Sequence, residues 1–85
     1  MPNLDIDELE SYSENILTLV SKNVIKYRKM KNYSQMQLAI EIGLSGGAYL
    51  GRAELRKNNQ HFNLKHLAKI SQILEVEICE FFKPL

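Results

Sequence analysis

The stretch of residues 33–54 constrains the fold of this chain more than any other, because it contains the start and end signals of two short helices. Ser34 is a favoured N-cap residue, and Gln37 three positions later completes a capping box. Gly43 follows an apolar helical face and predicts a left-handed helix end. We therefore expect one helix from Ser34 to just before Gly43, and a second over residues 47–55 after a tight turn.

Apolar residues at helical spacing predict three further helices. They are expected from Ser11 or Ser13 to about Lys31, over residues 64–74 and over residues 78–82. We find no strand signal, repeat or low-complexity segment. The sequence thus predicts an all-α fold, a compact five-helix domain over residues 13–85, preceded by a short acidic N-terminal arm over residues 1–12.

The same spacing predicts which residues form the core. The inward residues are expected to be Ile16, Val20, Val24, Tyr27, Leu38, Ala39, Ile42, Leu50, Ala53, Leu64, Leu67, Ile70 and Leu74. Residues 56–62 have the composition of an exposed loop, and Asn63 is expected to cap the helix that follows. Met30 and Met36 are expected at the edge of the core.

Composition excludes several classes of protein. No apolar run approaches the ~20 residues of a membrane span. The acidic start is unlike a signal peptide, and the single cysteine, Cys79, favours a cytoplasmic protein. His61 and His66 have no further ligand at zinc spacing, so we predict neither a metal nor a cofactor. We find no nucleophile–base set and no paired carboxylates in a predicted cleft, so we expect no enzymatic activity.

Charge is segregated along the chain although its net value is only +1. Residues 1–21 carry five acidic side chains and no Lys or Arg, whereas residues 22–69 carry ten Lys or Arg and two Glu. The basic charge therefore surrounds the two short helices. A helix-turn-helix places its second helix in the major groove, and nearby cations contact phosphates. The pattern therefore predicts binding to double-stranded DNA.

From about Ser21 to Pro84 the chain resembles the phage lambda repressor/Cro-type helix-turn-helix family, which includes restriction–modification controller proteins and many antitoxins. The resemblance rests on the spacing from Arg28 to Gln35 and on the segments SQMQLAIEIGL, YLGRAE and NLKHLAKISQILEVEICEFFKP. It implies a homodimeric transcription regulator, for example a repressor, that binds operator DNA. It also implies a structural ion pair between Arg28 and Glu54.

These arguments give a set of candidate site residues. DNA contacts are expected from Ser34, Gln35, Gln37, Ser45, Gly46, Gly47, Ala48, Tyr49, Arg52, Arg56, Lys57 and Lys65. Within this set, Tyr49 and Arg52 are expected to read bases, because the family's larger side chains are replaced here by Gly47 and Ala48. Gln35, Lys57 and Lys65 are expected to contact phosphates. Surplus apolar residues predict a dimer interface at Ile78, Phe81 and Phe82.

Two alternatives remain open at this stage. The chain could be an antitoxin that binds DNA and also masks a toxin, with the acidic arm contacting that protein. It could also be a protein-binding member of the family whose DNA-reading helix has degenerated.

Overall fold

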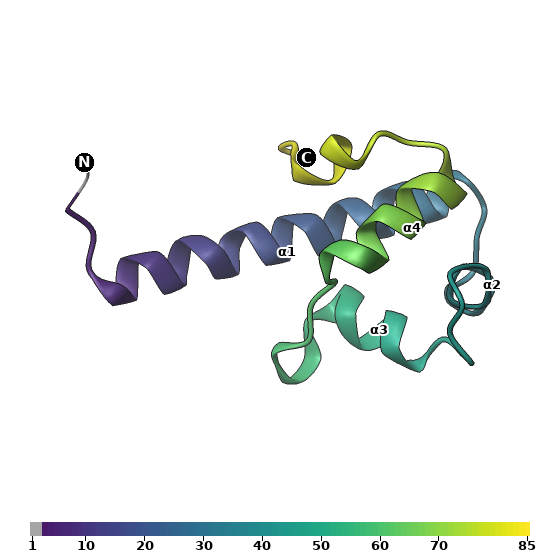
Figure 1. Ribbon diagram of the computed structural model, residues 1–85, viewed down its shortest axis with the longest axis horizontal. Helices are drawn as coiled ribbons and strands as arrows, with labels where there is room; N and C mark the ends of the chain where they lie inside the picture. The colour runs from purple at the N-terminus through teal and green to yellow at the C-terminus, as the bar shows by residue number, and fades with distance from the viewer. Residues whose placement is uncertain (1–2) are drawn as a thin grey trace.

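The computed structural model describes residues 3–85, which form four α-helices and two short 3-10 segments (Figure 1). The elements are α1 (Ile6–Met30), α2 (Gln35–Glu41), α3 (Ala48–Leu55), η1 (Lys57–Asn59), α4 (Leu64–Leu74) and η2 (Ile78–Phe82). The described part contains no strand, so the all-α prediction is confirmed over that part. The predicted fifth helix is instead the 3-10 segment η2, which makes the helix count four.

The first helix begins earlier than predicted. Asp5 is its N-cap and accepts a hydrogen bond from the backbone N–H of Glu8 at 2.8 Å. Asp7 and Glu8 in the first turn also stabilise the helix, because their negative charges lie near the positive end of its dipole. The predicted start at Ser11 or Ser13 is therefore wrong, and residues 6–12 of the predicted acidic arm belong to α1. The arm's first two residues, Met1 and Pro2, lie outside the described residues, and the division at residue 12 remains a prediction.

The two short helices begin and end where their local signals place them. Ser34 Oγ accepts from the Gln37 backbone N–H, and Gln37 Oε1 accepts from the Ser34 backbone N–H, which completes the capping box. Gly43 has a φ of +93°, the left-handed conformation that a glycine adopts without strain. Further along, Asn63 caps α4 by accepting from the His66 backbone N–H at 2.7 Å.

The core lies where all four helices meet. Val24, Leu38, Leu50, Ile70 and Phe81 are fully buried at its centre. Ile16 and Tyr27, expected inward, pack against it while only partly buried.

Three core predictions were wrong. Leu64, expected inward, is 70% exposed, because the inward face of α4 starts at Leu67. Phe62, in the predicted exposed loop, is 4% exposed and belongs to the core. Met30 and Met36 are more than half exposed and do not lie at the core edge.

Residues 80–83 of the C-terminal segment are hydrogen-bonded to α1. The Asn23 side-chain amide donates to the backbone carbonyls of Phe81 and Lys83 at 2.9 and 2.8 Å. The ring of Tyr27 packs edge-on against Phe81, and its hydroxyl donates to Glu80 at 3.1 Å. Hydrogen bonds from Lys83 and Tyr27 lower the pKa of the Glu80 carboxyl. The segment therefore belongs to the same core as the helices.

This arrangement overturns part of the predicted dimer interface. Phe81 is fully buried within its own chain, so it cannot lie on an interface between copies. Ile78 is half-buried and also packs against the core, while Phe82 is 44% exposed. Of the apolar residues that we assigned to a dimer interface, Phe81 therefore packs in the core of its own chain and Ile78 packs against that core.

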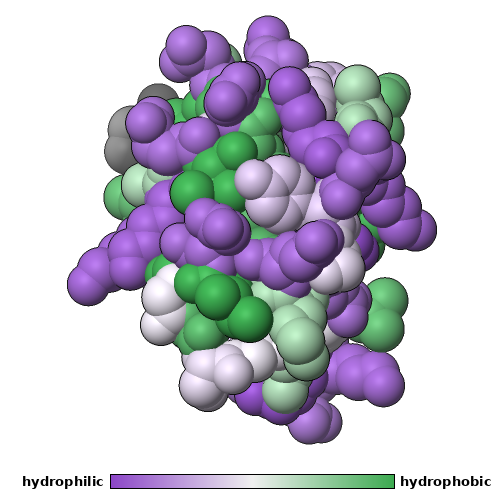
Figure 2. Space-filling model, turned by 90° about the vertical axis from the view of Figure 1, so that its right-hand side faces the viewer, coloured by the Kyte–Doolittle hydropathy of each residue, from purple (hydrophilic) through white to green (hydrophobic). Residues whose placement is uncertain are grey.

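The molecule is longer in one direction, with extents of 43 × 26 × 20 Å. The N-terminal half of α1 projects from the body, and α2 lies at the opposite end (Figure 1). Figure 2 shows that opposite end as apolar patches among hydrophilic side chains. Within the described residues, no helix is long and apolar enough to cross a membrane.

Candidate nucleic-acid interface

Helix α3 has two distinct faces. Leu50, Ala53 and Glu54 are buried against the body. Ala48, Arg52 and Leu55 are exposed, and their spacings of four and three place them on one outward face of the helix. Such a short helix depends on its buried face for stability. The outward face is therefore available for contact with a partner.

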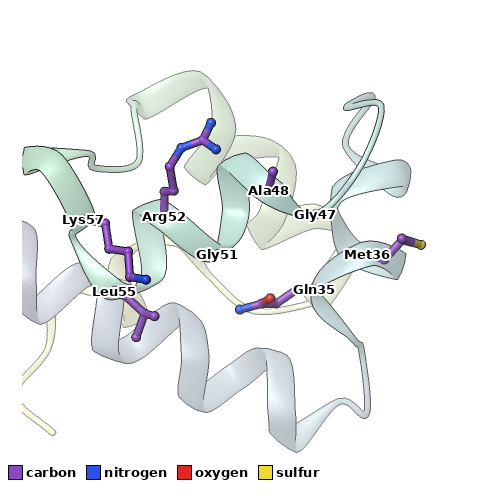
Figure 3. Close-up of a pocket in the computed structure, with 8 residues that line it drawn as sticks. All are labelled: Gln35, Met36, Gly47, Ala48, Gly51, Arg52, Leu55 and Lys57. Atoms are coloured by element: carbon purple, nitrogen blue, oxygen red, sulfur yellow. The ribbon is translucent and has the colours of Figure 1, made fainter.

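A shallow hollow runs between this outward face and the start of α2 (Figure 3). It is lined by Gln35, Met36, Gly47, Ala48, Gly51, Arg52, Leu55 and Lys57. In Figure 3 the side chain of Gln35 lies in the gap between the two helices, and the side chain of Arg52 extends from α3 away from that gap.

Two glycines allow α2 and α3 to approach closely. A Cβ on Gly47 would lie 3.3 Å from the backbone nitrogen of Met36, and a Cβ on Gly51 would lie 3.4 Å from Oε1 of Gln35. The Gly47 position therefore faces α2 and not the outward face. A DNA contact through the backbone of Gly47, which lines the hollow, stays a prediction. The glycine is needed for helix packing, whereas the neighbouring Gly46 has nothing within 4 Å of such a Cβ.

A buried ion pair fixes the orientation of α3. Arg28 Nε and Nη2 donate to the two carboxylate oxygens of Glu54 at 2.6 and 3.0 Å. Arg28 is 8% exposed and Glu54 is 5% exposed. Arg28 Nη1 also donates to the backbone carbonyl of Tyr33 at 2.9 Å. These two side chains, which the sequence analysis paired, therefore meet and join α1 to both ends of the helix-turn-helix.

Gln35 belongs to the same network. Its side-chain amide donates to Glu54 Oε1 at 2.9 Å, so α2 is joined to α3 through the carboxylate that holds α1. We expected this amide to contact a phosphate, and that contact stays a prediction. In the structure the amide completes the set of donors around the buried Glu54 carboxylate.

Tyr49 is also engaged within the protein. Its hydroxyl donates to the backbone carbonyl of His61 at 3.0 Å and lies 3.1 Å from Nδ1 of His66. Because the hydroxyl has one proton, Nδ1 of His66 must be the donor in the second contact. The ring of Tyr49 packs on His66 and Phe62. The side chain of Tyr49 therefore connects the 61–66 segment to α3, and base reading by Tyr49 stays a prediction.

The predicted basic contacts separate into two groups. Arg52 and Lys57 are exposed and line the hollow. Arg56 instead pairs with Glu14 of α1, and its side chain is 13% exposed. Lys65 is exposed on α4, outside the set that lines the hollow. Free positive charge at the hollow thus comes from Arg52 and Lys57.

The remaining predicted contacts lie at the ends of the turn. Ser34 and Gln37 are exposed and use the Ser34 Oγ and the Gln37 Oε1 in the capping box. Ser45 is exposed and Gly46 is partly exposed in the turn before α3. None of these four residues lines the hollow.

Sequence reasoning missed two residues of this surface. Met36 is 60% exposed and Leu55 is 63% exposed, and both line the hollow beside Arg52. The signal for Leu55 was present in the sequence, since it follows Ala48 and Arg52 at helical spacing. Among residues 3–85, no group of three or more potential metal ligands is found.

Over 64 residues the chain is 39% identical to the HTH-type transcriptional regulator SlrR of Bacillus subtilis (strain 168). The aligned part covers 75% of this chain and 41% of SlrR, so the chain spans about two-fifths of the length of that relative. No family model matches the chain, and no solved structure matches it. The similarity supports a helix-turn-helix regulator family, and the narrower lambda repressor/Cro-type resemblance remains a prediction.

Proposed function

We propose that this chain is a sequence-specific DNA-binding transcription regulator that places α3 in the major groove. The observation that carries the proposal is the outward face of α3, which presents Arg52 between Ala48 and Leu55 while the opposite face is held by a buried ion pair. A rigid helix with one exposed guanidinium has the geometry needed for reading a base edge. The similarity to a helix-turn-helix regulator agrees with this role.

Each side chain of this surface has a distinct proposed role. Arg52 donates two hydrogen bonds to a guanine, which discriminates by about 1–3 kcal/mol at one base pair. Leu55 and Met36 are apolar and contact thymine methyl groups. Lys57, next to them along the hollow, contacts a phosphate. DNA contacts by Ser34, Gln37 and Ser45 and a phosphate contact by Lys65 remain part of the proposal.

Specificity in this proposal also comes from DNA shape. Arg52 is the one long polar side chain on the outward face of α3, so few direct hydrogen bonds to bases are available. Groove width and deformability then contribute at base pairs that no side chain touches. The regulator acts as a homodimer on a two-fold symmetric operator in the cytoplasm, and repression is the proposed mode.

The test compares two variants on the chain's own upstream DNA. Arg52→Ala should weaken binding to the cognate site roughly 5- to 150-fold and should remove discrimination at one base pair in each half-site. Lys57→Ala should weaken binding to all sequences alike and lower the salt slope by about one unit. Fluorescence anisotropy across a salt series measures both effects. Equal weakening of every sequence by Arg52→Ala would make Arg52 a phosphate contact and would refute the base-reading role.

One alternative is also favoured by a specific observation. Met36 and Leu55 expose apolar surface beside the hollow, which would suit a protein groove as well as a thymine methyl. Failure of the wild-type chain to bind any upstream fragment at low salt would favour the protein-binding alternative. Binding of both DNA and a protein product of an adjacent gene would favour an antitoxin.

A further inference from the structure

Residues 6–15 form an overhang, the part of α1 that projects beyond the body of the molecule (Figure 1). All ten of these residues are exposed. They include three large apolar side chains, since Ile6, Leu9 and Tyr12 are 71%, 48% and 68% exposed. Glu14, near the base of the overhang, pairs with Arg56 of the body.

The overhang continues a helix that is already anchored in the core, so it needs no nucleation of its own. Propagation alone stabilises it only weakly, because most helical stability in proteins comes from packing an apolar face. The Asp5 cap and the acidic first turn support the start of the overhang but bury no apolar surface. A packing partner would stabilise the overhang and cover its apolar side chains.

The charge along α1 indicates what that partner is. Its N-terminal half carries Asp7, Glu8, Glu10 and Glu14 without any Lys or Arg. Its C-terminal half exposes Lys22, Lys26 and Lys29 and carries no Asp or Glu. The remaining cation of that half, Arg28, is buried against Glu54 and does not face a partner. Asp5 and Lys31 extend the two poles at the caps. A second α1 would be repelled in a parallel arrangement and attracted in an antiparallel one.

The outer face of α1 has the spacing that such a pairing requires. Tyr12, Leu19 and Lys26 follow one another at intervals of seven, with Met30 four residues further on. Tyr12 and Met30 are both more than 60% exposed, and Leu19 is partly exposed. Apolar residues at heptad spacing form the seam of paired helices, and flanking charges set their orientation. The buried residues Val20 and Val24 lie on another side of α1. Asn23, which lies between Leu19 and Lys26, is covered by the C-terminal segment, so that segment borders this face.

We propose that α1 pairs antiparallel with α1 of a second copy of this chain, each acidic overhang lying along the basic end of the partner's helix. With Leu19 at the centre, the register places residues 7–9 of one copy level with residues 29–31 of the other. The seam has few apolar residues, so charge supplies much of the attraction and salt weakens it. The pairing gives the homodimer of the proposed function a specific interface, but it does not depend on DNA.

The experiment uses two complementary charge reversals, Asp7→Lys/Glu8→Lys and Lys29→Glu/Lys31→Glu. Each variant alone places like charges against each other and should dimerise at least about tenfold more weakly than the wild type. An equimolar mixture of the two restores opposite charges at both ends and should form a heterodimer. Sedimentation velocity without DNA measures these states against the 9.8 kDa chain mass.

The matched control for Lys29→Glu/Lys31→Glu is Lys57→Glu/Lys65→Glu, which makes the same charge change on exposed residues outside α1 and should leave dimerisation unchanged. Circular dichroism of each variant reports loss of helix, and recovery on mixing cannot arise from a frayed helix. A wild-type monomer at low salt and high concentration, or a mixture that stays monomeric, would overturn the pairing. DNA binding by such a monomer would leave the proposed function standing.

Discussion

The buried pair of Arg28 and Glu54 predicts a large loss of unfolding free energy when one partner is removed. Replacing Arg28 with Met leaves the Glu54 carboxylate buried at 5% exposure, with the Gln35 amide as its remaining donor. Breaking a buried pair in this way costs about 3–5 kcal/mol. The carbonyl of Tyr33 also loses its donor, which adds about 0.5–1.5 kcal/mol.

This loss is large for a chain of 85 residues. At about 0.05–0.15 kcal/mol per residue, the free energy of unfolding is roughly 4–13 kcal/mol. Arg28→Met should therefore remove a large fraction of the stability, and Glu54→Met should act similarly. The double variant should cost less than the sum of the single variants, because it leaves no buried charge unpaired.

The assay is urea unfolding followed by far-ultraviolet circular dichroism, which gives the midpoint and the slope for each variant. Arg52→Met is the matched control, since Arg52 is exposed on the same helix as Glu54 and should change stability by no more than about 0.5 kcal/mol. Additive effects below about 1 kcal/mol for Arg28→Met and Glu54→Met would show that the pair does not hold α1 to α3.

Three further predictions concern α3 and its neighbours. Gly47→Ala should destabilise the fold by about 1–3 kcal/mol in urea unfolding, because its Cβ meets the backbone of Met36, whereas Gly46→Ala should not; equal effects would refute the packing role of Gly47. Tyr49→Phe should lower stability by about 0.5–1.5 kcal/mol and leave DNA affinity of the folded protein unchanged in anisotropy; lost base discrimination would restore Tyr49 as a base reader. Burial and the neighbouring Lys69 and Lys65 lower the pKa of His66 from 6.5, so the unfolded chain binds a proton more readily than the folded one. Thermal melts should therefore show the melting temperature falling as pH drops below about 6.5, and the fall should be smaller in His66→Gln.

The sequence by itself determined the features that depend on a few neighbouring residues. The Ser34–Gln37 capping box, the left-handed Gly43 and the Asn63 cap each involve contacts within about four positions, so local chemistry specifies them. Periodicity also identified most of the core, because a helix of known phase can bury only one face. The all-helical fold followed from these local signals.

Local signals gave the wrong start for the first helix, because two capping signals competed there. Asp5 and Ser11 both satisfy the rules for a helix start, with Glu8 and Glu14 three residues after them. In the structure Asp5 is the cap, and the helix runs on through Ser11. The sequence could not rank the two starts, because each is valid by itself.

Only the tertiary structure decided the partners of the polar and aromatic side chains. Arg56 was expected to meet DNA but pairs with Glu14, 42 residues earlier in the chain. Tyr49 was expected to read bases but contacts the segment that precedes α4. Phe81 was expected at a dimer interface but completes the core beside Tyr27. In each case the partner of a side chain depends on which groups, far apart in the sequence, are brought close together by folding. Residue type and spacing along the chain do not specify the distance between such groups in space.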